Sequence, residues 1–324
     1  MKFRSLAGVL SAAILLAGTS IAPALELTAA HVNPQGEPSN TAFAELAERL
    51  KSSKTGLSMT VFPQGQVGDE KDAIEQVRLG AVTMTTVATS NLSAFAPSAG
   101  VFDLPFLFEN GDVQPWVVSD GPIGEEIAAK IEQESGLKVL GWWSGGERHA
   151  FTRTVDVKTP ADLDGTKIRV IGSPVYLDTF NALGAKATPM PYGEVYTALA
   201  TGTIDAAEND SSGYRNMRFY EQAPHLSLTG HFFLYKVVVA NVDALAQLTP
   251  DQRAEFDEIF AEVTKHQREL FATNMTDDLQ YLKAQGVTVT QPDKAPFIEA
   301  TKPVIDKYAK IYGEDLIKRI QASR

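Results

Sequence analysis

The chain has 324 residues, and 29 Lys and Arg residues against 40 Asp and Glu residues give it a formal net charge of −11. This acidity argues against binding to nucleic acid or to an anionic membrane surface, because both require basic patches. Cysteine is absent, so the fold depends on its hydrophobic core and not on disulfides, and a zinc site has little support.

The first 24 residues have the features of a secretory signal peptide. Lys2 and Arg4 precede an apolar stretch from Leu6 to Leu16, and Ala22-Pro23-Ala24 is typical of a cleavage site. The apolar stretch is short for a membrane anchor, and no other segment is long enough to span a bilayer. Cleavage after Ala24 removes two basic residues and leaves residues 25–324 with a formal net charge of −13. We therefore predict an exported periplasmic protein, long enough for two domains.

The N-terminal third alternates strands and helices. Strands are predicted over 25–31, 57–62 and 82–88, separated by a helix that ends near Gly56 and a second helix over 69–79. This order predicts a parallel sheet with helices on its faces. Residues 91–115 are irregular, and the apolar run within them is expected to pack between layers.

The remaining chain continues the α/β pattern. Helices are expected over 123–133, 174–183 and 192–201, and strands over 137–143, 167–171 and 236–240, with another strand beginning at 204–207. Thr249-Pro250-Asp251-Gln252 starts a helix with a possible capping box. Its apolar face continues towards Gln285, which exceeds an ordinary globular helix, so the helix either is kinked or bridges two domains.

Three polar residues at strand ends suggest a site for a small carboxylate. Arg169 lies on an apolar strand, where a charge must be paired or reach a ligand. Arg148 follows two glycines, and Asn209 ends a strand at the edge where open α/β sheets bind ligands. A planar guanidinium matches a carboxylate at two points. The alternatives are a structural ion pair for Arg169, pairing of Arg148 with Glu147, and a turn role for Asn209.

Further candidates surround these three. Glu70, near a helix N-terminus, and Asp210 and Tyr214, which follow Asn209, are suited to hydrogen bonds with ligand hydroxyl groups. Phe106 and Phe232 are candidate walls of a pocket, as are the two neighbouring tryptophans at 142–143. Aromatic residues at strand spacing are more often core residues, so a core position is the competing interpretation.

Signatures of catalysis are weak. Ser144 lies beside glycines with His149 nearby, but no GxSxG elbow is present. The five histidines show no HExxH spacing, and neither a Walker A loop nor a GxGxxG loop occurs, so no metal or cofactor is predicted. A secreted serine hydrolase that uses Ser144 and His149 remains an alternative function.

The chain resembles the substrate-binding proteins of TRAP (tripartite ATP-independent periplasmic) transporters, the DctP-type family. The resemblance covers essentially the whole exported chain in order, and its central block is highly specific. The matching segments, besides the leader, are Gly65–Gly68, Leu104–Phe108, Thr159–Val170, Pro189–Leu199 and Gly202–Asn209.

The resemblance implies a two-lobed α/β binding protein with a central cleft, crossing strands and a long helix that spans both lobes. Arg169 matches the family's ligand-carboxylate arginine, Arg148 a second cleft arginine, and Asn209 an asparagine near the same carboxylate. The lobes would close on a hinge, and the loaded form would deliver its ligand to the small and large membrane subunits of an ion-driven permease. A sensor that acts on a membrane receptor is a weaker alternative.

We assign lobe I to residues 25–145 and 235–275 and lobe II to residues 146–234 and 276–324, and expect a monomer. Gly172-Ser173-Pro174 replaces the polar residue that other family members carry three positions after the arginine, so that ligand contact is lost or moves to Ser173. Glu70 and Asp210 would repel a second ligand charge. The expected ligand is therefore a hydroxylated monocarboxylate such as a uronate or aldonate, with a C4-dicarboxylate or 2-oxo acid as the alternative.

Overall fold

The computed structural model describes residues 25–109 and 111–323, so the predicted signal peptide lies outside the described residues. Within them, one mixed sheet has the strand order β2-β1-β3-β8-β4-β7-β5-β6, with β9 paired to β8. The strands are β1 (Glu26–Ala30), β2 (Ser58–Phe62), β3 (Met84–Ala88), β4 (Leu137–Thr152), β5 (Lys167–Val170), β6 (Lys186–Pro189), β7 (Ala206–Asn209), β8 (His225–Asn241) and β9 (Thr288–Thr290). As predicted from the βαβαβ pattern, β1 pairs in parallel with β2 and with β3.

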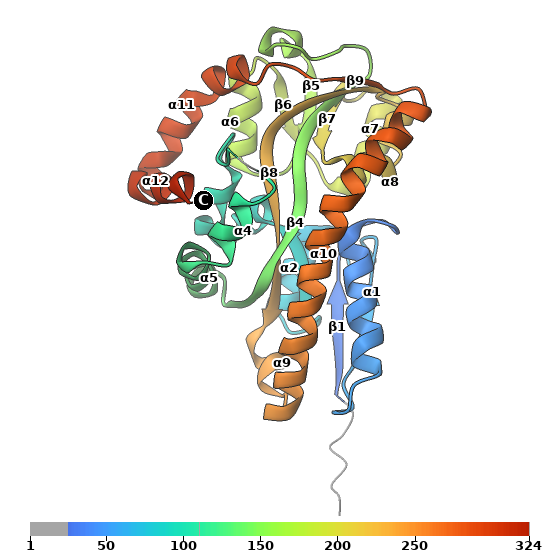
Figure 1. Ribbon diagram of the computed structural model, residues 1–324, viewed down its shortest axis with the longest axis vertical. Helices are drawn as coiled ribbons and strands as arrows, with labels where there is room; N and C mark the ends of the chain where they lie inside the picture. Colours follow the sequence, from blue (N-terminus) through green and yellow to red (C-terminus); the bar gives the residue numbers. More distant parts are fainter. Residues whose placement is uncertain (1–24, 110, 324) are drawn as a thin grey trace, which may run out of the picture.

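Helices cover the sheet (Figure 1). They are α1 (Pro38–Lys51), α2 (Glu70–Arg78), α3 (Thr89–Leu92), α4 (Gln114–Ser119), α5 (Pro122–Ser135), α6 (Pro174–Ala182), α7 (Val195–Thr201), α8 (Ser211–Asn216), α9 (Val242–Ala246), α10 (Pro250–Ala284), α11 (Ala295–Tyr312) and α12 (Glu314–Ala322). Local signals explain several helix starts: Asp69 forms a capping box with Asp72, and Thr249 forms one with Gln252.

Two long strands, β4 and β8, cross the whole molecule (Figure 1). Residues Lys236–Ala240 of β8 pair with β3, whereas residues His149–Thr152 of β4 pair with β7 in the other half of the sheet. Only the segments 137–143 and 236–240 were predicted. The missed part of β4 begins at Ser144, and the pairing register shifts directly after it, at Gly145-Gly146. The missed part of β8 is interrupted by polar residues.

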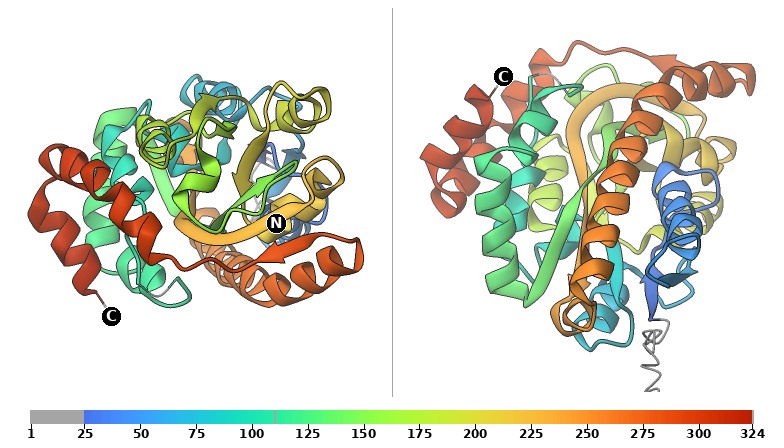
Figure 2. Two further views of the ribbon diagram at one scale, coloured as in Figure 1. Left: turned by 90° about the horizontal axis from the view of Figure 1, so that it is seen from above. Right: turned by 60° about the horizontal axis from the view of Figure 1, so that its bottom comes forward.

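Helix α10 bridges the two halves, which confirms one of the two alternatives for the long apolar face. Phe256 and Val263 lie in the apolar core formed with α1 and β1. Leu282, near the other end of the helix, lies in a second core with Phe151 and Tyr214. Figures 1 and 2 show α10 running beside β4, with α1 alongside its first half.

The hydrophobic residues gather in separate clusters on the two sides of the crossing strands. The C-terminal helices connect them, since α11 packs on α6 and the side chain of Gln114 in α4 donates to the carbonyl of Ile320 in α12. Burial of these apolar surfaces is the main stabilising term in a chain without disulfides.

Candidate functional site

Strand ends from both halves of the sheet meet around one pocket. The inner pocket, of about 40 Å³, is lined mostly by polar residues, which come from β4, β5, β7 and β8 and from the loops and helix starts that follow the strands. An open outer cavity of about 590 Å³ adjoins it. Glu70, Asn91, Arg169, Tyr192 and Val32 line both. The carboxyl ends of strands in an open α/β sheet are the expected place for a ligand.

Arg169 lies at the junction of the inner pocket and the outer cavity. It is 3% exposed on β5, and its Nε and Nη2 both donate to the carbonyl oxygen of Met190, at 2.9 and 2.7 Å. The prolines on either side of Met190 hold that carbonyl in place. In the described chain the Arg169 guanidinium forms no ion pair, and burial lowers its pKa. A buried cation without a carboxylate partner attracts an anion.

Arg148 is held by an internal ion pair. Its Nε and Nη2 donate to the two carboxylate oxygens of Glu208 at 2.7 and 2.8 Å, in two-point geometry. Burial raises the pKa of Glu208, but the Arg148 guanidinium outweighs it and brings that pKa to about 2. The alternative of a structural pair was correct in kind but wrong in partner, because Glu147 accepts from Lys294 instead.

Asn209 connects the two sides of the pocket. Its Oδ1 accepts from Arg148 Nη1 at 2.6 Å, and its Nδ2 donates to the Tyr192 hydroxyl at 3.0 Å. A Cβ on Gly213 would lie 2.3 Å from Asn209 Nδ2, so this position in α8 has no room for a side chain. The Asn209 amide is therefore fixed in orientation before any ligand arrives.

Glu70 and Asp210 also face the inner pocket. Glu70 Oε2 accepts from the Ala88 amide at 3.1 Å and from Asn91 Nδ2 at 2.6 Å. Asp210 caps α8 by accepting from the Gly213 amide at 2.8 Å, and burial raises its pKa. The structure thus brings together five of the predicted site residues: Arg169, Arg148, Asn209, Glu70 and Asp210.

Four other candidates do not line these two cavities. Tyr214 is fully buried in a core and donates to the Ala223 carbonyl, and Ser173 donates to Asp103 Oδ2 at 3.1 Å. Phe232 packs against Tyr176 with ring centroids 4.0 Å apart, and Phe106 packs at the edge of the same core. In each case apolar burial or an internal hydrogen bond holds the side chain away from the pocket.

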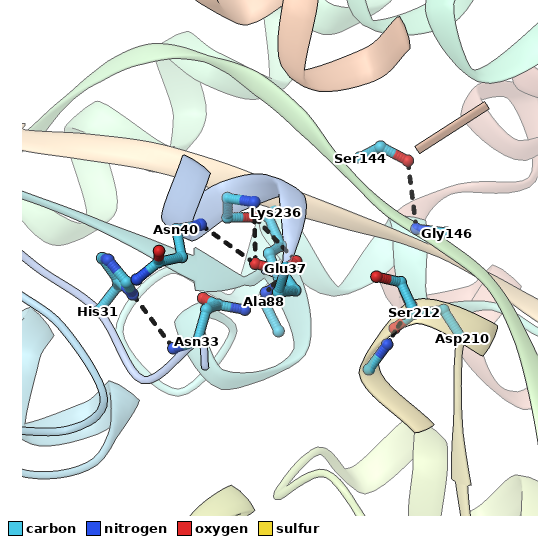
Figure 3. Close-up of polar contacts among 12 residues, drawn as sticks. His31, Asn33, Glu37, Asn40, Ala88, Ser144, Gly146, Asp210, Ser212 and Lys236 are labelled. Carbon is cyan, nitrogen blue, oxygen red and sulfur yellow. Dashed lines mark hydrogen bonds and ion pairs between the residues drawn. The ribbon is translucent and has the colours of Figure 1, made fainter. Parts of the chain in front are cut away.

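Sequence reasoning did not single out several lining residues. Asn33, Glu37, Asn91, Tyr192 and Lys236 all face the inner pocket, and Figure 3 shows Asn33, Glu37 and Lys236 close together. A signal existed for Lys236, a lone charge among valines on a strand, and for Tyr192, which follows Pro189-Met190-Pro191. Asn33 and Glu37 carried only the weak signal of following a strand end.

The geometry does not support a nucleophile at Ser144. Its Oγ accepts from the Gly146 amide at 3.2 Å. His149 Nδ1 accepts from the Gly230 amide at 3.1 Å, so the neutral ring carries its proton on Nε2. Nδ1 is thus already occupied as an acceptor, and Nε2 cannot accept a further proton from Ser144. Burial lowers the pKa of His149 to about 4, which keeps the ring neutral at pH 7.

Within the described residues, no cluster of His, Cys, Asp or Glu is arranged to hold a metal ion. The same residues contain no helix with the length and hydropathy needed to cross a bilayer. A polar pocket between two halves, joined by two crossing strands and one long helix, defines a two-lobed solute-binding protein.

Comparison with known proteins agrees with this class. The family model of the bacterial extracellular solute-binding proteins, family 7, matches residues 29–311, and the chain belongs to this family. The 2,3-diketo-L-gulonate-binding periplasmic protein YiaO of Escherichia coli K12 is 33% identical, over 99% of each chain. The members of this family with solved structures are periplasmic solute-binding proteins of TRAP transporters and not enzymes, so a serine hydrolase is not the function of this chain.

Two solved structures illustrate the family. A TRAP periplasmic solute-binding protein from Citrobacter koseri with bound D-glucuronate is 35% identical, with a TM-score of 0.87 over 92% of this chain and 99% of that one. One from Sulfurospirillum deleyianum with bound succinate is 26% identical, with a TM-score of 0.88 over 93% and 99% of the two chains.

Proposed function

We propose that this protein captures a hydroxylated monocarboxylate, such as a uronate or an aldonate, and delivers it to a TRAP permease. The observation that carries the proposal is Arg169, a buried guanidinium that faces the pocket without a carboxylate partner. An incoming carboxylate supplies the missing negative charge and accepts hydrogen bonds from a fixed fork of donors. Asn209 and Tyr192 line the same pocket as the Arg169 guanidinium.

The charges of the inner pocket support one carboxylate and not two. Glu208 neutralises Arg148, and Glu37 lies beside Lys236. Asp210 Oδ2 also lies 3.8 Å from Arg148 Nη1, and Glu70 is the remaining carboxylate that lines the inner pocket. A second ligand carboxylate would meet these negative groups, whereas hydroxyl groups donate to them.

The relatives bind acids of both kinds. Family structures contain D-glucuronate, galacturonate and galactonate, and YiaO is named for a keto sugar acid. The structure with succinate supports the alternative, a C4-dicarboxylate. The carboxylates of this inner pocket are the reason to favour the sugar acid.

Lobe closure, oligomeric state and delivery belong to the same proposal. We assign lobe I to residues 25–145 and 235–275 and lobe II to residues 146–234 and 276–324. Within the last segment, α12 packs Leu316, Ile317 and Ile320 into the lobe I core and contacts α4 and α5. The protein acts as a monomer and hands its ligand to the small and large permease subunits. Light scattering checks the mass, and two multi-span membrane proteins encoded beside the gene would favour transport over sensing.

Calorimetry with a panel of small acids tests the ligand and the site together. We expect uronates or aldonates to bind more tightly than succinate or malate. Arg169→Lys keeps the charge but loses the planar fork, so affinity should fall by roughly tenfold or more. Tighter binding of succinate than of every sugar acid would overturn the ligand class. Unchanged affinity in Arg169→Lys would remove Arg169 from the site.

A further inference from the structure

The inner pocket extends past the two arginines to a second group of polar side chains, Asn33, Glu37 and Lys236 (Figure 3). Asn33 follows β1, Glu37 caps the N-terminus of α1, and Lys236 lies on β8 opposite Ala88 of β3. These residues line the inner pocket but not the outer cavity. Binding of a carboxylate at Arg169 does not require these three residues.

Lys236 has hydrogen-bond donors without a protein partner. It is 8% exposed in a run of valines, where an ammonium group is costly to bury without partners. Among the described residues its ammonium group has one hydrogen-bond partner, Glu37 Oε1, at the long distance of 3.4 Å. An ammonium group carries three donors. The Lys236 side chain is therefore incompletely satisfied by the protein.

Glu37 is a rigid partner. Its Oε2 accepts from the amides of Ser39 and Asn40 at 2.8 and 3.3 Å, and its Oε1 accepts from the Ser39 hydroxyl at 3.1 Å. These bonds at the start of α1 fix the carboxylate. Oε1 remains next to Lys236 on the pocket side, where a ligand hydroxyl can donate to it.

Asn33 supplies an open acceptor. The residue is 2% exposed, and its Oδ1 has no hydrogen-bond partner among the described residues. A buried amide oxygen without a partner is uncommon because it loses its water without compensation. The pocket thus presents a free acceptor and free donors side by side.

We propose that Asn33, Glu37 and Lys236 form a subsite for neighbouring hydroxyl groups at the end of the ligand remote from its carboxylate; this rests on the proposed function above. A hydroxyl group donates and accepts at once, so it can accept from Lys236 while donating to Glu37 or Asn33. A second carboxylate cannot donate, and it would face Glu37 and Asp210. The ligand therefore extends inward from Arg169, towards the ends of β1 and β3.

The outer cavity is the competing direction for the ligand. Its charged groups include Asp69 and Asp72, which are already occupied in the capping box of α2, and the exposed side chain of Lys71. These solvated groups gain little from a ligand hydroxyl, because water already satisfies them. The polar groups that lack partners, on Lys236 and Asn33, line the inner pocket instead.

Two lysines allow a matched test with acids of different length. In Lys236→Met, we expect the Kd of six-carbon D-galactonate to rise by about ten- to a hundredfold, because bonds to a charged group are lost. The Kd of three-carbon D-glycerate should change by less than about threefold, because that acid reaches only Arg169. Thermal shift at high ligand concentration measures the weaker acid.

Asn33→Ala is the second variant, and it removes no charge. It should show the same dependence on ligand length with a smaller loss for D-galactonate. Lys71→Met, in the outer cavity, is the control and should leave both acids unaffected.

Equal losses for both acids in Lys236→Met, no loss for either, or a length-dependent loss in Lys71→Met would each overturn the subsite. Failure of the proposed function gives a different pattern. In that case Arg169→Lys binds both acids as tightly as the natural chain does.

Discussion

The two buried arginines of the site differ in what they leave behind when removed. Arg148→Ala leaves the Glu208 carboxylate without its ion-pair partner; this carboxylate is fully buried and bonded to Arg148 at two points. Breaking such a pair typically costs about 3–5 kcal/mol. Arg169→Ala leaves only the Met190 carbonyl without a hydrogen-bond donor, for which a loss of about 1–3 kcal/mol in the free energy of unfolding is expected. Urea unfolding without ligand measures both losses.

The contrast between the variants separates a structural arginine from a binding one. Arg148→Ala should lower stability more, whereas Arg169→Ala should lower affinity with most of the stability retained. Equal stability losses would mean that Arg169 also has a structural role that the described contacts do not show.

Asp103 makes stability depend on pH. Its carboxyl group is buried, bonded to the hydroxyls of Thr89 and Ser173 at 2.9 and 3.1 Å, and burial raises its pKa to about 8. The folded state therefore keeps a proton that the unfolded state releases above pH 4. Stability should fall as pH rises towards 8, by at most about 1.4 kcal/mol per pH unit from this group.

Asp103→Asn preserves the shape and cannot ionise. Its free energy of unfolding, measured by urea titration, should fall less steeply with pH than that of the natural chain over this window. Parallel curves for the two proteins would show that Asp103 is not protonated in the folded state.

At the scale of elements, α8 holds Asn209 in place through a glycine. Gly213→Ala would push a methyl group to within 2.3 Å of Asn209 Nδ2, so the amide must move away from Tyr192 or Arg148. We expect a loss of ligand affinity of roughly tenfold, as for overpacking of a tight site. Calorimetry with D-glucuronate checks it. Gly193→Ala is the control, because its added methyl would meet open space.

Elements with a clear period were predictable, and those held by tertiary pairing were not. β1, β2, β3 and α2 appear close to their predicted bounds because apolar spacing and a capping box mark them. The strand β6 was missed because its four residues are largely exposed and carry a proline. The first half of β8 was missed because its composition does not mark it as a strand. It is a strand because it pairs with β4, which is distant in the sequence.

The site shows the same division. Arg169 and Asn209 were accessible to sequence reasoning because a charge on an apolar strand and an amide at a strand end need an explanation. The inward position of Lys236 depends on its register opposite Ala88 and Trp143. Tyr214 and Phe232 face cores instead of the pocket, since orientation within a helix or a crossing strand follows from packing that no spacing rule supplies.

At the scale of the whole molecule, we expect the hinge in the strands that connect the two halves. In β4 the pairing with β8 shifts register between Ser144 and Glu147 and again between Arg148 and Ala150, beside the site. Bulges bend a strand and weaken its ladder. Gly146 has a φ of 77°, which only glycine adopts without strain. Relative motion of the lobes should therefore concentrate around residues 144–150.

Closure on this hinge predicts a change in overall shape. Since Arg169 and Asn209 lie on β5 and β7 while Glu70 and Lys236 lie across the pocket, a ligand that contacts both groups favours the closed arrangement. Small-angle X-ray scattering should show a smaller radius of gyration with saturating D-glucuronate. Arg169→Lys at the same ligand concentration should remain closer to the ligand-free value. Tight binding with an unchanged radius would mean that the ligand is held by one lobe alone, and the hinge at residues 144–150 would then have no part in capture.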